Sequence, residues 1–348
     1  MPSFPRGSFQ GRPPIDLPER MIMNKNYERL VTCAGTPAKI SEALAAAAPV
    51  KLSAENGTYQ KIPGGDMPGD TININEQAVL AAERLFPFIT KRLSSAAEKN
   101  TYGRVVISVS GGSGSGKTCL SALTAYFLNK NNIGARIMSG DNYVHRIPVE
   151  NDAERLRIFR HNGISAMVES GLFDGEIFER LQKYQIEQNE KGHAADIDEP
   201  WFETYLEGGK AALNDHLGSR NEQNFDMLND MISAFKDGAK ELWFRRMGRD
   251  NTALWYEKAD LTDTRVLILE WTHGLSKHLT GIDTRIFIHT TPEETYASRI
   301  ARSRDDNAKT DFIQAVIAIE QKQLSALIPT ADIIINRAGE MIRKEEIL

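Results

Sequence analysis

The stretch SVSGGSGSGKTCL (residues 108–120) decides the fold of this chain. It follows the β-branched run VVI (residues 105–107), which is typical of a buried parallel strand. After it, apolar residues recur at helical spacing in CLSALTAYFL (residues 119–128). The sequence therefore predicts a glycine-rich turn that joins a strand to a helix.

Within this turn, Gly111, four further residues and Gly116-Lys117-Thr118 match the phosphate-binding loop G-x-x-x-x-G-K-[ST]. Glycine is needed because backbone N–H groups must approach a phosphate closely, where a Cβ atom would obstruct them. We expect Lys117 to reach the β- and γ-phosphates of a nucleotide and the Thr118 hydroxyl to bind Mg²⁺. The residues predicted to bind the nucleotide are Gly111, Gly112, Ser113, Gly114, Ser115, Gly116, Lys117, Thr118 and Cys119.

The composition narrows the choice of partners and compartment. The 348 residues suffice for one large domain or two, and the net charge of −5 argues against nucleic acid as the main partner. The two cysteines, Cys33 and Cys119, suggest neither a disulfide framework nor a zinc site, which favours a reducing, cytoplasmic location. We expect no membrane partner, because no apolar run approaches membrane-spanning length and residues 1–20 lack the apolar core of a signal peptide.

Strand-like and helix-like segments alternate along the chain. Four strand-like segments follow the first: ARIMSGDNY (135–143), RVLILEW (265–271), TRIFIHT (284–290) and DIIINRAG (332–339). This alternation predicts an α/β fold, a P-loop NTPase-type three-layer αβα arrangement with a parallel sheet. Residues 76–348 would form this domain, with a largely helical insertion at about 151–262. Residues 1–75 would form an N-terminal extension, either a small module or an arm that packs on another subunit of a homo-oligomer.

Two acidic residues end predicted strands, at the edge where open parallel sheets bind ligands. Asp141 ends the second strand in SGDNY, and Glu270 ends the third in LILEW. Each could instead be a helix cap or an ordinary surface acid. Their shared position beside the phosphate loop favours a role for both in one site.

Five segments occur in the order seen in one group of P-loop kinases. They are GGSGSGKT (111–118), SGDNY (139–143), NFDMLNDMISAFKDG (224–238), LILEWTHGL (267–275) and IFIHTTPEETYASRIARSRDD (286–306). Together, over residues 104–337, they resemble the uridine kinase and phosphoribulokinase group. The resemblance implies ATP and Mg²⁺ as cofactors, Asp141 as the base, and a lid at about 292–308 that carries Arg299, Arg302 and Arg304.

The chain departs from that group where the acceptor is recognised. Trp271 follows Glu270 at a position where the group usually has glycine, and NFD (224–226) lacks the His-Pro that usually follows. The acceptor therefore stays open between a sugar, a sugar phosphate and a nucleoside. The segment GDNYVHRIPVENDAERLRIFR (140–160) resembles adenylyl-sulfate kinases, whose activity is an alternative. A P-loop ATPase that is not a kinase is a more distant alternative.

The hypothesis at this point is an ATP-dependent small-molecule kinase that transfers the γ-phosphate to an acceptor hydroxyl. Asp141 would accept the proton of that hydroxyl. Thr118 and Glu270 would hold Mg²⁺, and Lys117 would neutralise phosphate charge. The residues predicted to contact the acceptor are Tyr143, His145, Arg146, Arg246 and His273.

Arginines are the predicted anion-binding groups. On the lid, Arg302 and Arg304 are expected to close over the charge that develops during transfer, and Arg299 to bind the nucleotide. The cluster WFRRMGRD (243–250), which includes Arg246, is either a solvated face or a site for a phosphate of the acceptor. An anionic acceptor is therefore one alternative.

Overall fold

The structure is a computed structural model, and it describes residues 35–52, 54–55, 58–59, 62, 66, 72, 74–187, 190, 199–248, 252–291, 294 and 311–347. Arg249, together with the three predicted lid arginines Arg299, Arg302 and Arg304, lies outside these residues.

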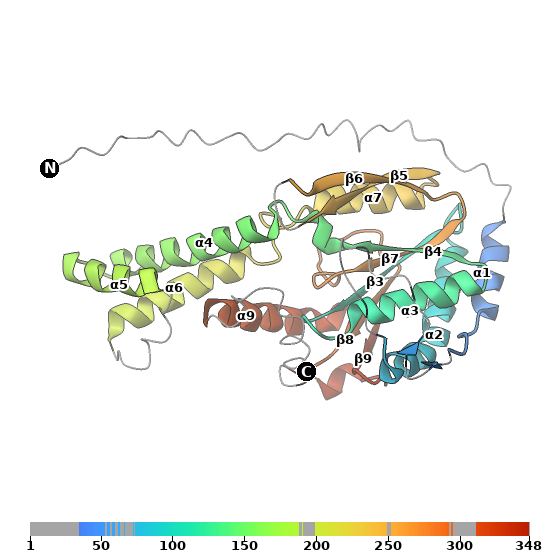
Figure 1. Cartoon of the computed structure of the whole chain (residues 1–348), viewed down its shortest axis with the longest axis horizontal. Helices are drawn as coiled ribbons and strands as arrows, with labels where there is room; N and C mark the ends of the chain where they lie inside the picture. Colours follow the sequence, from blue (N-terminus) through green and yellow to red (C-terminus); the bar gives the residue numbers. More distant parts are fainter. Residues whose placement is uncertain are drawn as a thin grey trace.

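A five-stranded parallel sheet forms the centre of the molecule (Figure 1). Its strands are β3 (Val105–Gly111), β4 (Gly134–Ser139), β7 (Thr264–Glu270), β8 (Thr284–Ile288) and β9 (Ile333–Ile335). They lie in the order β4-β7-β3-β8-β9, and every neighbouring pair is parallel. The expected α/β fold with a parallel sheet is confirmed.

Helices cover both faces of this sheet and complete three layers (Figure 1). One face packs on α1 (Pro37–Ala46), α2 (Glu76–Ala97) and α3 (Lys117–Lys130). The other packs on α7 (Phe225–Lys236) and, at the β8–β9 side, on α9 (Asp311–Leu327). Alternate residues of β3 divide between the two cores, since Val105 and Ile107 belong to the first and Val106 to the second. Among the described residues, none of the helices is both long and apolar enough to span a membrane.

The part of the N-terminal extension that the structure describes packs on the same chain. The Ser41 hydroxyl donates to Glu98 (2.9 Å) and Leu44 is fully buried against the α1–α3 core. A short antiparallel pair, β1 (Ala54–Glu55) and β2 (Thr58–Tyr59), follows. The alternative of an arm on another subunit, and with it a homo-oligomer, stays a prediction.

Three helices of the insertion form an elongated projection from the sheet: α4 (Pro148–Glu169), α5 (Gly175–Glu187) and α6 (Pro200–His216) (Figure 1). Helices α4 and α6 approach closely at Gly163, where a Cβ atom would lie 2.6 Å from the Tyr205 carbonyl oxygen. The projection has its own core, which includes Phe159, Met167, Trp201, Phe202, Tyr205 and Leu213. Val316 of α9 joins this core, so α9 links the projection to the sheet.

A β-hairpin lies at the end of the insertion, which the sequence predicted to be largely helical over about 151–262. Strands β5 (Glu241–Met247) and β6 (Leu254–Asp260) pair in antiparallel register. Arg245 and Arg246 are 7% and 4% exposed, so the first of the two alternatives for this arginine run, a solvated face, is wrong for these two residues. The hairpin escaped the sequence analysis because its buried arginines interrupt the apolar alternation expected of a strand.

Candidate active site

The phosphate-binding loop joins β3 to α3, as the sequence predicted. Gly116 has φ +102°, a left-handed conformation that favours glycine, and α3 begins directly after it at Lys117. At Gly111 a Cβ atom would lie 2.8 Å from the Ile288 carbonyl oxygen, so only glycine fits there. The Lys117 ammonium is nearly buried and donates to the carbonyl oxygens of Gly111 (3.0 Å) and Gly112 (3.1 Å). The lysine is therefore held over the loop in which a phosphate would lie.

Thr118, in the first turn of α3, meets Glu270 at the end of β7. The Thr118 hydroxyl donates to Glu270 Oε1 at 3.3 Å, and Glu270 is 6% exposed. Hydroxyl and carboxylate oxygens are ligands that suit Mg²⁺, which takes one or two protein ligands and completes its shell with water and phosphate oxygens. Across the described part of the chain, no group of three or more His, Cys, Asp or Glu side chains is arranged around a metal position. The Thr118–Glu270 pair thus fits a nucleotide-bound Mg²⁺.

Asp141 lies in a 3₁₀ turn, η2 (Gly140–Tyr143), directly after β4. Ser139, the last residue of β4, pairs in register with Glu270, which brings Asp141 to the same edge of the sheet as the predicted metal ligands. The Asp141 side chain is exposed, whereas Asn142 is fully buried and accepts a hydrogen bond from the Met247 backbone N–H (3.0 Å). The turn is therefore anchored by its second half while Asp141 faces outward.

Asp66 anchors the start of the same turn, and the sequence analysis missed it. Its carboxylate accepts from the Ser139 backbone N–H (3.0 Å) and pairs with Arg246 (2.9 Å). Arg246 also pairs with Glu257 at 3.1 Å. Burial raises the pKa of Asp66, against the opposing charge of Arg246. No signal in the turn-rich segment around Asp66 could have shown that this acid reaches β4.

Two of the residues predicted to contact the acceptor, Arg246 and Tyr143, are buried in the protein interior. Arg246 is 4% exposed and neutralised by Asp66 and Glu257, so we correct its assignment to that of a structural residue. Tyr143 is fully buried in the core with Trp271, and burial raises its pKa. A side chain enclosed in this way cannot contact an acceptor in this conformation.

Three other predicted acceptor residues lie near Asp141 or the phosphate loop. His145 is exposed, with Nε2 3.1 Å from the Arg220 carbonyl oxygen. Arg146 lies 3.7 Å from Glu154. Burial lowers the pKa of His273 to about 4, and the charge of Lys117 contributes, so His273 is neutral at pH 7. Their roles stay predictions.

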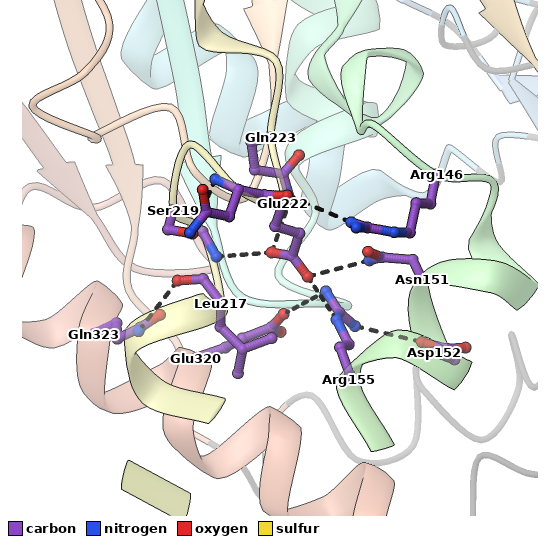
Figure 2. A network of polar contacts seen from close by, with 12 residues as sticks. Arg146, Asn151, Asp152, Arg155, Leu217, Ser219, Glu222, Gln223, Glu320 and Gln323 are labelled. Atoms are coloured by element: carbon purple, nitrogen blue, oxygen red, sulfur yellow. Dashed lines mark hydrogen bonds and ion pairs between the residues drawn. The ribbon is translucent and has the colours of Figure 1, made fainter. Parts of the chain in front are cut away.

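A buried polar network centred on Glu222 is a second feature that the sequence analysis missed (Figure 2). At its centre, Glu222 is fully buried and accepts from Arg155 Nε (2.6 Å), Asn151 (3.1 Å) and the Gly218 backbone N–H (2.7 Å). Although burial opposes ionisation, these donors lower the pKa of Glu222 to about 2. Arg155 also faces Glu320 of α9 at 3.5 Å. These residues come from three distant segments, so no local pattern relates them.

A hollow of about 310 Å³ lies after the end of β9, the outer strand on the other side of the sheet from β4. Gln77, Glu294, Asn336, Arg337 and Ala338 line it. Asn336 follows β9 directly, and Glu294 forms a capping box with Thr291, whose N–H donates to the glutamate at 2.8 Å.

The fold and the loop define this chain as an α/β protein of the P-loop type. It is 34% identical over 252 residues to the bifunctional α-galactosidase/sucrose kinase AgaSK of Mediterraneibacter gnavus, a match that covers 72% of this chain and 22% of that protein. The chain therefore spans about a fifth of the length of this curated relative. The match covers 252 of the 348 residues, so wherever it begins it includes the phosphate loop that starts at Gly111.

Solved structures show more distant similarity. D-glycerate 3-kinase from Cryptococcus neoformans var. grubii superposes with a TM-score of 0.42 at 11% identity, over 78% of this chain and 99% of that chain. A protein of Silicibacter sp. TM1040 described as a fructose transport system kinase gives 0.37 at 13% identity, over 64% and 85%. Similarity at this level does not indicate a shared function. The chain matches no protein-family model, and none of these three relatives is an adenylyl-sulfate kinase.

Proposed function

We propose that this chain is an ATP-dependent kinase that phosphorylates a hydroxyl group of a sugar, with sucrose as the first candidate. One observation carries the proposal. Three side chains lie at the carboxyl ends of three neighbouring strands. Lys117 follows β3, Glu270 ends β7 and Asp141 follows β4. These are the groups that phosphoryl transfer needs: a cation for the phosphates, a metal ligand and a proton acceptor.

The strand order supports one arrangement of the nucleotide and the acceptor along the carboxyl ends of the strands. The carboxyl ends of β4, β7, β3 and β8 lie next to one another in a row, with neighbouring strands about 4.8 Å apart. Asp141 stands at the β4 end and the phosphate loop in the middle. The hollow beside Asn336 and Glu294 stands at the β8–β9 end. We infer that the nucleobase occupies this hollow and the acceptor the Asp141 side.

The chain's own residues would act as follows in the transfer step. The acceptor oxygen forms a bond to the γ-phosphorus, the bond from that phosphorus to the β,γ-bridging oxygen breaks, and ADP leaves. Asp141 takes the proton of the acceptor hydroxyl. Lys117, now on the Gly111 and Gly112 carbonyl oxygens, turns to phosphate oxygens and neutralises their charge. Thr118 and Glu270 would hold Mg²⁺, which supplies further positive charge to the phosphates.

The relative supports the choice of acceptor. AgaSK is named for two activities, and this chain matches about a fifth of it. We infer that the matched part bears the kinase activity, since the part of this chain that it matches includes the phosphate loop. Of the predicted lid arginines, Arg302 and Arg304 belong to the proposal as the groups that close over the γ-phosphate, and Arg299 as a group that binds the nucleotide.

ADP release tests the function directly. Purified chain is incubated with Mg·ATP and with sucrose, glucose, fructose or uridine, and the phosphorylated product is identified by ³¹P NMR. We expect sucrose to raise ADP release at least tenfold above the acceptor-free rate, and Lys117→Ala to abolish the increase. ADP release that is the same with and without every acceptor would support an ATPase and contradict the proposal.

A further inference from the structure

His273 follows the middle one of the three strands that lead to the proposed catalytic groups. It comes three residues after Glu270, the end of β7. Strand β7 lies between β4, which leads to Asp141, and β3, which leads to the phosphate loop. During transfer the acceptor oxygen must lie between Asp141 and the γ-phosphate. The segment after β7 therefore borders the place where that oxygen reacts.

Backbone contacts hold this segment against the end of β3. The Trp271 N–H donates to the Val109 carbonyl oxygen (3.1 Å), and the Ser108 hydroxyl donates to the Gly274 carbonyl oxygen (2.9 Å). His273 lies between these two anchored residues in the sequence. It is thus fixed beside the strand that leads directly into the phosphate loop.

The His273 ring packs against Trp271 and Gly218. Its centroid is 5.2 Å from that of Trp271, in an edge-to-face arrangement, and Trp271 lies against Gly140, the residue before Asp141. A Cβ atom on Gly218 would lie 2.8 Å from Nδ1 and 2.9 Å from Cε1 of the imidazole. The ring is therefore placed by contacts on the turn of the proposed base and on the loop before Glu222.

Gly218 is itself held by the Glu222 network. Its backbone N–H donates to Glu222 Oε2 at 2.7 Å, and the same carboxylate accepts from Arg155 and Asn151 (Figure 2). Gly218 has φ +65°, a left-handed conformation that favours glycine. A side chain there would also collide with the imidazole of His273. The network thus supports a glycine that allows the imidazole to lie close.

The hydrogen-bonding groups of His273 are not used by the protein. Within the part of the chain that the structure describes, neither ring nitrogen of this half-buried side chain hydrogen-bonds to a protein group. Burial lowers its pKa to about 4, so the imidazole is neutral at pH 7 and has one N–H donor and one acceptor nitrogen. These two groups match a hydroxyl, which also donates and accepts. Unused polar groups at such a position are typical of a ligand-binding residue.

We propose that His273 hydrogen-bonds to a hydroxyl group of the acceptor, and that Glu222 acts on acceptor recognition through Gly218, which sets the position of the imidazole. This inference rests on the proposed function and deepens it. His273 is a binding residue, whereas Gly218 and Glu222 are positioning residues, because they act on the acceptor only through the ring. A histidine that only filled space against Trp271 would be replaceable by another ring of similar size.

Binding measured apart from turnover tests the contact itself. The full chain, labelled with ¹⁵N at its seven histidines and loaded with Mg²⁺ and a non-hydrolysable ATP analogue, is titrated with sucrose, glucose, fructose and uridine. We expect the imidazole NMR signals that are missing from His273→Gln to shift as one of these compounds binds. Binding without this shift, or no binding of any of the four, overturns the inference. A shift without a rise in ADP release contradicts the kinase function and leaves the inference standing.

Two substitutions of His273 separate hydrogen bonding from packing. His273→Phe keeps a ring against Trp271 but has no nitrogen, so affinity for the acceptor should fall about 10- to 100-fold, while affinity for the ATP analogue stays within about twofold. The amide of His273→Gln can donate and accept, so this variant should bind the acceptor more tightly than His273→Phe does. Parental affinity for the acceptor in His273→Phe contradicts a binding role.

Gly218→Ala tests whether the position of the ring matters, and Gly171→Ala is the matched control. The two glycines have nearly the same left-handed backbone, with φ +65° and +67°, but a Cβ atom on Gly171 meets nothing within 4 Å. Gly218→Ala should push the imidazole away and weaken acceptor binding about tenfold or more. Gly171→Ala has the same backbone strain and should bind the acceptor like the parent. Equal losses of acceptor affinity in both variants contradict the positioning role.

The double variant Gly218→Ala/His273→Phe tests whether Gly218 acts through His273. Once the ring nitrogens are absent, displacing the ring removes no further hydrogen bond. The double variant should therefore bind the acceptor about as tightly as His273→Phe alone. Losses of affinity that add in the double variant overturn the proposed action of Gly218 on the imidazole.

Discussion

Trp271 lies directly against Gly140, so closely that a Cβ atom on Gly140 would be 2.1 Å from the Trp271 Cγ. Trp271 is 1% exposed and packs in the core with Phe225, whose ring centroid is 5.3 Å away. The residue after the predicted metal ligand thus supports the first residue of the turn that carries Asp141. The tryptophan that departs from the Glu-Gly pattern of uridine kinases has a packing role beneath the proposed base.

Gly140→Ala should displace this turn. The added methyl group overpacks the contact with Trp271, so we expect a loss of about 1–3 kcal/mol in the free energy of unfolding, measured with urea. The kcat should fall more than the KM for ATP rises, since Asp141 moves and the loop does not. Gly175→Ala is the matched control, because a Cβ atom there meets nothing within 4 Å. A Gly140→Ala variant as stable and active as the parent contradicts the packing interpretation.

Asp141→Asn tests the base. The amide keeps the size of the side chain but cannot take up a proton, so transfer to the acceptor should slow by about 10²–10⁴-fold. Binding of Mg·ATP, titrated by calorimetry, should stay close to that of the parent. If binding is lost instead, Asp141 is a metal ligand and its assignment as base is wrong.

Glu270→Gln, unlike Asp141→Asn, should weaken the binding of Mg·ATP. Removing the charge beside Thr118 should weaken ATP binding in the presence of Mg²⁺ at least tenfold, and should change binding in EDTA little. Thr118→Ser keeps the hydroxyl and should bind Mg·ATP like the parent, whereas Thr118→Ala should resemble Glu270→Gln. Equal losses with and without Mg²⁺ would count against a metal site at this pair.

Asp66 and Glu257 offer a matched pair of tests on Arg246. The side chains of Asp66 and Arg246 are 8% and 5% exposed, whereas that of Glu257 is 52% exposed. Breaking the buried pair with Asp66→Asn should cost about 3–5 kcal/mol of unfolding free energy, because the buried guanidinium of Arg246 loses its buried carboxylate partner. Glu257→Gln should cost less than about 1 kcal/mol, since surface ion pairs are weak. Similar costs for both variants would show that burial does not distinguish these partners.

The stability of the protein should depend on the pH through Glu320. Its pKa is about 7 in the folded protein, raised by burial and by Glu222 and Asp141 against Arg155 and Lys117, while an unperturbed glutamate has a pKa of about 4.5. Unfolding therefore releases a proton between these values, and the free energy of unfolding should fall as pH rises through this window. Glu320→Gln cannot titrate, so its Tm minus that of the parent should increase from pH 4.5 to 7. A difference that stays constant or decreases over this range contradicts the raised pKa.

The sequence by itself determined the parallel sheet and the phosphate loop, because both depend on short-range patterns. The run of β-branched residues before Gly111 and the glycines up to Gly116 have to be adjacent in sequence to make a strand, a turn and a helix. It also indicated Asp141 and Glu270, since the ends of parallel strands must meet at one edge. Their placement beside the loop needed only the strand assignments.

Tertiary structure alone decided which polar groups surround that edge. Asp66 pairs with Arg246, and Arg155 meets Glu222 and Glu320, across segments far apart in the chain. Burial is what turns a run of arginines into structural ion pairs and raises the pKa of one glutamate, and burial depends on how elements pack. Arg246 and Tyr143 were therefore predicted as acceptor residues from their neighbours in sequence, whereas packing enclosed both in the protein interior.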